Sequence, residues 1–130
     1  MKKLWLDDVR KPPYGNYIWC KTVDEAIASV QRRPFHEWAL DHDLGGQLAH
    51  YGKGPYDYSA PNGTHFIAGA RLKCVKIPSR ITIHSTSIQG TANMMVDLYR
   101  WAVEVEQDIE IIIRPMQGRI MDKTPYYEGR

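Results

Sequence analysis

The chain has 130 residues, 43% of them hydrophobic, and a formal net charge of +2. A chain of this length forms a single domain with its own core, and its composition excludes a disordered or fibrous protein. The small basic excess is spread along the chain and does not indicate a nucleic-acid-binding face. No apolar run approaches the length of a membrane span, and the amino terminus lacks a signal-peptide core. We therefore expect one cytoplasmic domain over residues 1–130, with no membrane partner.

Five short apolar runs, rich in aromatic and β-branched residues, predict strands. They are residues 3–6, 17–20, 37–40, 80–84 and 108–114. The segment between the first two strands contains Pro12, Pro13 and Gly15. It is too short and too proline-rich to form a helix.

Three helices are predicted between the later strands. Thr22 and Glu25 form a capping box that opens a helix to about Arg33, before Pro34. The other two helices are expected at about residues 64–75 and 91–106. Continuous apolar strands that alternate with helices indicate a five-stranded parallel sheet covered on both faces. The expected fold class is therefore a three-layer α/β/α arrangement.

Two segments match no regular element. The loop at residues 45–63 is long for a compact domain, and it is either a functional lid or a solvated loop. Its residues Tyr51, Lys53 and Tyr56 suit stacking on a base and pairing with a phosphate. The irregular tail at residues 118–130 either covers a sheet edge or mediates an oligomer.

Polar residues follow four of the predicted strands. They are Asp7 and Asp8, then Asp41, His42 and Asp43, then His84, Ser85 and Thr86, and finally Arg114. In parallel sheets, ligands bind in the crevice beyond the carboxyl ends of the strands. The sequence therefore predicts a functional site at this edge of the sheet.

The acidic residues at these strand ends are candidates for a metal site. Asp7, Asp8 and Asp41 offer oxygen ligands suited to Mg²⁺, while a contribution from His42 or His84 would favour Mn²⁺. Taken singly, each aspartate is more often a residue that ends a strand or caps a helix, whereas three strand ends taken together weaken that interpretation. Clustered carboxylates need a shared proton or a cation, so the cofactor is either Mg²⁺ or Mn²⁺ or, where a proton is shared, none.

The segment that begins at His84 is a candidate for phosphate chemistry. Neutral imidazole can accept a proton from water, although a hydrogen-bonded core histidine is the alternative interpretation. A glycine and a helix amino terminus downstream offer backbone donors to an anion. The expected phosphate contacts are Arg10, Ser85, Thr86, Gly90, Asn93 and Arg114. Both arginines are explained equally well by ion pairs with the aspartates.

His42 is the second candidate for proton transfer. Its neighbours Asp41 and Asp43 favour the protonated form, which suits a general acid. The expected catalytic set is therefore His84 as base and His42 as acid, with Asp41 and Asp43 beside them.

These strand-end residues resemble the receiver domain of response regulators. In that resemblance Asp7 and Asp8 match the acidic pair that binds magnesium, and Asp41 matches the phosphorylated aspartate. Ser85 matches the hydroxyl residue, and Arg114 stands where a lysine is expected. The departures are the missing first helix, the arginine and the added histidines, and they weigh against a true phosphoreceiver.

The segments "LDDVRKPP", "LDHDLG" and "HSTSIQGTANM" are more similar to a receiver-like family predicted to process cyclic phosphates. This resemblance implies a receiver or flavodoxin-like fold, with the Pro-rich loop in place of the first helix. It also implies a phosphoesterase that binds or opens a cyclic phosphate on a nucleotide or RNA end. The alternative is a non-catalytic module that sequesters or senses a nucleotide signal, for example in phage or bacterial defence.

Overall fold

The computed structural model describes residues 2–45 and 60–114. The strands are β1 (Lys3–Leu6), β2 (Tyr17–Cys20), β3 (Glu37–Leu40), β4 (Arg80–Ile83) and β5 (Glu110–Ile113). The helices are α1 (Val23–Arg32), α3 (Gly63–Leu72) and α4 (Ile88–Glu104). All eight elements lie where the sequence predicts them, with ends that shift by up to three residues.

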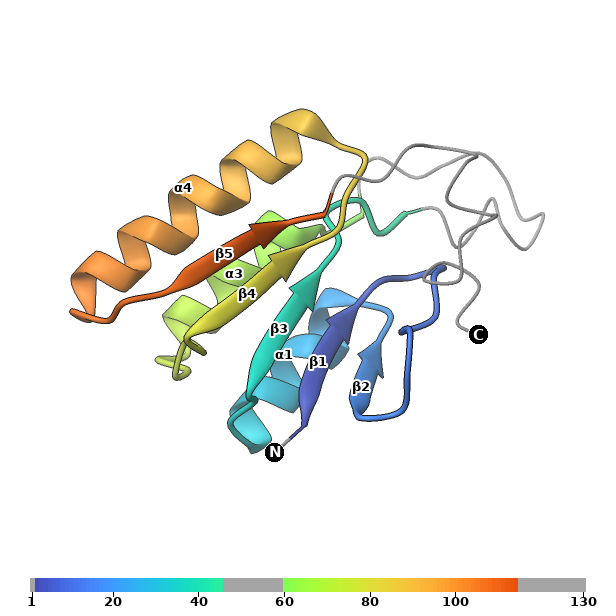
Figure 1. The fold of residues 1–130 in the computed structure, drawn as a ribbon, viewed down its shortest axis with the longest axis horizontal. Coiled ribbons are helices and arrows are strands. Elements are labelled where there is room, and N and C mark those ends of the chain that lie inside the picture. The colour runs from blue at the N-terminus through green and yellow to red at the C-terminus, as the bar shows by residue number, and fades with distance from the viewer. Residues whose placement is uncertain (1, 46–59, 115–130) are drawn as a thin grey trace.

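The five strands form one parallel sheet in the order β2-β1-β3-β4-β5. Figure 1 shows their arrowheads pointing in one direction, so their carboxyl ends share one edge of the sheet. The predicted five-stranded parallel sheet is therefore confirmed. Residues 7–16 join the neighbouring strands β1 and β2 without a helix.

The three described helices cover a single face of the sheet. Figure 1 shows α1 and α3 behind the strands, and α4 packs against α3 on that face through the common core. Leu4, Leu40 and Ile83 project from that face and belong to a continuous core with Phe66 of α3 and Met94 of α4. The capping box predicted at Thr22 is present at the start of α1. Residues 2–45 and 60–114 supply no second helical layer, so within them the three-layer expectation is not met.

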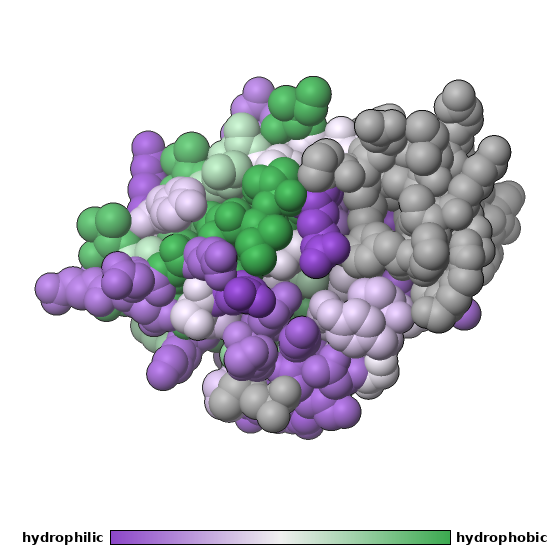
Figure 2. All heavy atoms as spheres, in the orientation of Figure 1, coloured by the Kyte–Doolittle hydropathy of each residue, from purple (hydrophilic) through white to green (hydrophobic). Residues whose placement is uncertain are grey.

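Successive side chains of a strand point to opposite faces of the sheet, so every second residue projects from the other face. Most of these residues are polar or aromatic. One row across the sheet consists of Tyr17, Lys3, Glu37, Arg80 and Glu110, and the next consists of Trp19, Trp5, Ala39, Thr82 and Ile112. Figure 2 views this face, on which hydrophilic residues lie beside a hydrophobic area. This face thus differs in chemistry from the apolar face under the helices.

The hydrogen-bond ladder continues for one residue beyond the strands. The N–H groups of Asp7, Asp41, His84 and Arg114 donate to the carbonyls of Cys20, Leu6, Leu40 and Ile83, respectively. These four residues form a third row on the same face, directly at the carboxyl edge. The sheet therefore fixes the backbone of four predicted site residues in register.

Candidate functional site

The turn after β1 is organised by Asp7. Its Oδ1 accepts hydrogen bonds at 2.9 Å from the backbone N–H groups of both Val9 and Arg10. The indole N–H groups of Trp5 and Trp19 donate at 2.7 Å to the carbonyls of Arg10 and Asp7. These contacts fold the chain back on itself, so the Arg10 side chain returns to the strand ends.

Three carboxylates gather at the carboxyl edge of the sheet. Oxygen atoms of Asp7, Asp8 and Asp41 lie within 4.8 Å of one another, and the three residues are at most 4% exposed. Arg10 Nη1 lies 3.5 Å from Asp7 Oδ2 and 3.8 Å from Asp41 Oδ1. The ion pairs proposed as one explanation of Arg10 are therefore present.

Burial raises the pKa of Asp41 well above its usual range, and the charge on Asp7 raises it further. The Arg10 guanidinium and the hydrogen bond from the His42 N–H oppose this effect without overcoming it. The environment therefore disfavours the charged form of Asp41, and a further cation at the cluster would favour it.

The donor set fits a hard divalent cation. All three groups are carboxylates, which Mg²⁺ and Mn²⁺ accept as ligands, and their oxygen atoms are close enough to share one ion. Three ionised carboxylates carry three negative charges, and Arg10 supplies one positive charge. One divalent ion would balance the two negative charges that are left. Asp7, Asp8 and Asp41 are thus the residues that would hold such an ion.

His84 is fully buried and joins the acidic cluster through Asp7. Its Nε2 lies 3.2 Å from Asp7 Oδ2, and its ring stacks on Trp5 with centroids 4.0 Å apart and planes 10° apart. Burial is the main cause that lowers the pKa of His84, and the charges on Arg10 and Arg114 lower it further. The imidazole is accordingly held neutral and oriented by an aspartate.

His42 lies on the helical side of the strand end. Its Nδ1 lies 2.7 Å from Asp43 Oδ1, and its Nε2 lies 3.2 Å from Thr64 Oγ1 in α3. A Cβ atom on Gly90 of α4 would lie 2.3 Å from the His42 ring. His84, by contrast, stacks on Trp5 on the face without described helices. The structure thus places the His84 ring beside Asp7 of the acidic cluster and the His42 ring beside Asp43 and Thr64, so a joint action of the two imidazoles on one phosphate stays a prediction.

Gly90 is the position where this packing has the sharpest consequence. Gly90→Ala is expected to destabilise the fold by about 1–3 kcal/mol, because the added methyl group overlaps the His42 ring. Chemical denaturation of both proteins measures the difference. Gly15→Ala is the matched control, since a Cβ atom there meets nothing within 4 Å. Equal stability of the two variants would contradict the described position of His42.

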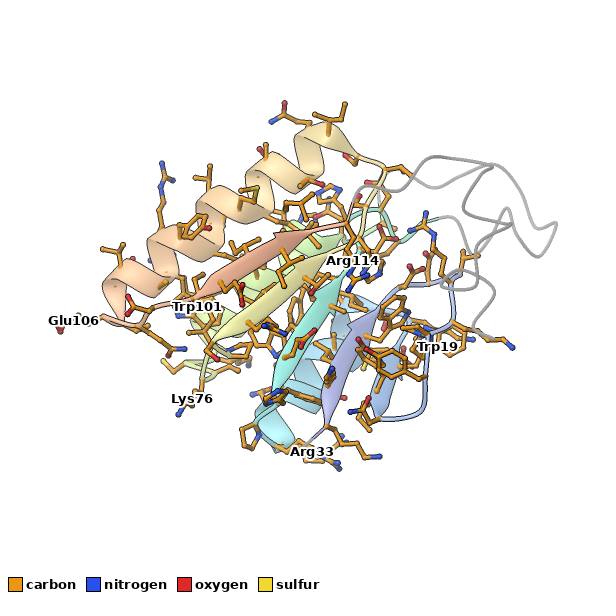
Figure 3. The ribbon with its side chains drawn as sticks, in the orientation of Figure 1. Trp19, Arg33, Lys76, Trp101, Glu106 and Arg114 are labelled. Atoms are coloured by element: carbon orange, nitrogen blue, oxygen red, sulfur yellow. The ribbon has the colours of Figure 1, made fainter. Side chains whose placement is uncertain are left out.

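The predicted phosphate contacts are only partly brought together. The Gly90 N–H donates to Ser87 Oγ at 2.9 Å, and exposed Asn93 accepts a hydrogen bond from Gln89, so both groups have partners within α4 and its cap, and the anion site at these two residues stays a prediction. Ser85 is buried, and its Oγ accepts a hydrogen bond from the Ser87 N–H, whereas Thr86 is exposed. Arg114 lies at the carboxyl edge beside the central strands (Figure 3).

The remaining predictions concern segments outside the described residues. The loop residues Tyr51, Lys53 and Tyr56 and the tail at residues 118–130 fall there. Sequence reasoning missed Trp5 and Trp19, whose indole groups hold the Asp7 turn, and Thr64, which contacts His42. The position of Trp5 two residues before Asp7 is the signal for the first of these, since both side chains project from one face.

Comparison with protein families matches residues 2–100 to the cyclic-phosphate processing receiver domain. The chain belongs to this family. The matched region includes the acidic cluster, Arg10 and His84. Membership agrees with the resemblance drawn from the three sequence segments, and it suggests a role related to cyclic phosphates.

No curated protein and no solved structure matches the chain. Among the described residues, no helix combines the length and the apolar character needed to cross a bilayer.

Proposed function

We propose that this receiver domain binds a cyclic phosphate on a nucleotide or RNA end at the carboxyl edge of its sheet and opens it by hydrolysis. One observation carries the proposal: a buried imidazole lies 3.2 Å from one member of a cluster of three carboxylates within 4.8 Å. Titratable groups whose environments push their pKa values apart are typical of catalytic sites. Burial raises the pKa of Asp41 and lowers that of His84.

His84 is the proposed group for proton transfer. Its contact with Asp7 favours the tautomer with the proton on Nε2, which places the basic lone pair on Nδ1. The imidazole accepts a proton from water as the water oxygen bonds to phosphorus. One of the two P–O ester bonds in the cyclic phosphate then breaks, and the imidazolium returns that proton to the leaving ester oxygen. Asp7 keeps the ring in place during both transfers.

The other residues serve to bind the phosphate. Asp7, Asp8 and Asp41 are proposed to hold Mg²⁺ or Mn²⁺, which when bound supplies positive charge to phosphate oxygens. Arg10 and Arg114 add guanidinium groups that suit developing negative charge. Asp43 is proposed to orient His42 rather than to contact the phosphate, because it lies 2.7 Å from that ring.

The second candidate function is sequestration or sensing of the same ligand without turnover. Complete burial of His84 and near-complete burial of the carboxylates favour a site that retains a ligand over one that exchanges it rapidly. This alternative predicts tight binding with no product. For both functions, we also propose that the loop at residues 45–63 contacts the ligand. Assembly of the protein into an oligomer is a further proposal that fits either function.

A panel of cyclic phosphates tests the proposal. Nucleoside 2′,3′-cyclic and 3′,5′-cyclic monophosphates and RNA with a 2′,3′-cyclic end are incubated with the protein in chelator, Mg²⁺ or Mn²⁺, and products are separated by chromatography. We expect a phosphomonoester from at least one substrate, with a larger yield in the presence of a divalent ion. Binding without product supports sequestration, and the absence of both binding and product overturns the two functions together.

A further inference from the structure

A small cavity lies on the face of the sheet without described helices, below the strand-end cluster. Its volume is about 150 Å³, and its floor includes Glu37, Ala39 and Thr82 from the two central strands β3 and β4. Typical pockets for a whole small-molecule ligand are about 300 Å³ or larger. This cavity is therefore sized for one part of a ligand, such as a ring.

The walls of the cavity are aromatic on one side and aliphatic on the other. Tyr17 from β2 and Tyr14 from the preceding loop lie on the first side, with ring centroids 5.4 Å apart, and Ile112 of β5 lies on the second. Trp5 meets Tyr17 edge to face at 5.3 Å. Such walls suit a flat heterocycle, because aromatic faces stack on bases of any sequence.

The floor holds a buried carboxylate that is paired with a half-buried lysine. Glu37 is 6% exposed, Lys3 Nζ lies 3.7 Å from its Oε1, and Thr82 Oγ1 lies 3.5 Å from its Oε2. Both distances are at the upper limit for a direct contact. A buried carboxylate is stabilised by short hydrogen bonds, and Lys3 and Thr82 lie too far from Glu37 to supply them. The Glu37 carboxylate is therefore suited to accept hydrogen bonds from a ligand.

Two residues connect the cavity with the strand-end cluster. Trp5 lines the cavity and also stacks on His84. Arg114 also lines the cavity, and its N–H donates to the Ile83 carbonyl at the carboxyl edge of the sheet. Trp5 and Arg114 thus belong to both places, and a ligand of nucleotide size would span them.

We propose that this cavity receives the base of a guanine nucleotide whose cyclic phosphate lies at the strand-end cluster. The inference rests on the proposed function and adds the class of substrate. Guanine presents two adjacent N–H donors and a neighbouring carbonyl oxygen on one edge. The Glu37 carboxylate accepts the two donors, and the Lys3 ammonium donates to the carbonyl. Adenine, cytosine and uracil each offer fewer than two adjacent donors to a carboxylate.

The four nucleoside 2′,3′-cyclic monophosphates test the proposal. Each is compared by kcat/KM, or by Kd where it binds without turnover. We expect guanosine to be preferred over the other three by about tenfold or more, the ratio that one well-placed bidentate contact provides. Glu37→Gln should lower kcat/KM for guanosine, or raise its Kd, to the value for adenosine and change the other three nucleotides by less than about threefold.

Two further variants keep the test independent of folding. Tyr14→Ala, at a residue that is 58% exposed, should weaken all four nucleotides about equally without changing their order. Lys76→Gln alters an exposed lysine at the opposite end of the sheet (Figure 3) and should change nothing. Equal treatment of the four nucleotides by the wild-type protein overturns the base pocket alone. Failure to bind or open any of them overturns the pocket and the proposed function together.

Discussion

His84→Gln is expected to lower kcat/KM for the cyclic phosphate by about 10²–10⁴, the range that loss of a general acid–base group produces. Glutamine retains an N–H donor that can reach Asp7 but cannot accept and return the proton of water. Because the proposed loss concerns the reaction and not binding, KM should change by much less than kcat. Steady-state kinetics with the preferred nucleotide measures both parameters.

The matched control is His42→Gln. The two histidines follow neighbouring strands, but His42 contacts Asp43 and Thr64, whereas His84 contacts Asp7 and stacks on Trp5. We expect the His42 variant to keep kcat within about tenfold of the wild type, as is usual for a group outside the reacting site. A loss of similar size in both variants, with unchanged thermal stability, would contradict the role proposed for His84.

Asp41→Asn is expected to abolish stabilisation of the fold by divalent cations. In the wild type, Mg²⁺ or Mn²⁺ at about one hundred times its Kd should stabilise by about 2.7 kcal/mol, which raises the Tm of a domain of this size by about 10 °C. The variant removes one of the three carboxylates within 4.8 Å and should show a shift below about 3 °C. Thermal unfolding with and without the ion measures the difference.

The same variant has a predicted pH dependence in chelator. Because burial raises the pKa of Asp41 above the unfolded value of 3.8, the folded state binds the proton more tightly, so wild-type stability falls as pH rises from about 4 through the raised pKa. Asp41→Asn should remove that fall and be more stable than the wild type at pH 7. The lowered pKa of His84 acts in the opposite direction, because the folded state binds that proton less tightly and stability is lost as pH falls below 6.5. The Asp41→Asn variant should keep this loss of stability at low pH.

A wild-type Tm that does not change with either ion would contradict the proposed metal site. An Asp41→Asn variant that is less stable than the wild type at pH 7 in chelator would contradict the buried, raised-pKa carboxyl.

The secondary structure and the location of the site were predictable from the sequence because each depends on local patterns. Short apolar runs mark the strands, Thr22 and Glu25 mark a helix start, and polar residues mark the end of each strand. Parallel strands place their carboxyl ends at one edge whatever the details of packing. The acidic cluster follows from that topology, which is why Asp7, Asp8 and Asp41 meet as expected.

The side to which each group points was harder to predict. Asp41 and His42 are neighbours in sequence, but the ladder directs the first toward Arg10 and the second toward Thr64 and Gly90. Strict alternation contains that information, because Trp5 and Asp7 share one face with Ala39 and Asp41. The apolar runs predict strands that are buried on both faces, and this prediction misses the polar row at Lys3, Glu37 and Arg80.

Phosphorus NMR under single-turnover conditions would show the opening of the cyclic phosphate itself. A nucleoside 2′,3′-cyclic phosphate is mixed with excess protein and Mg²⁺, and the cyclic phosphate resonance is followed. We expect this resonance to be replaced by a phosphomonoester resonance with the wild type and to persist with His84→Gln. A resonance that keeps its position and intensity in the presence of excess wild-type protein would contradict the assignment of this strand-end cluster to cyclic phosphates.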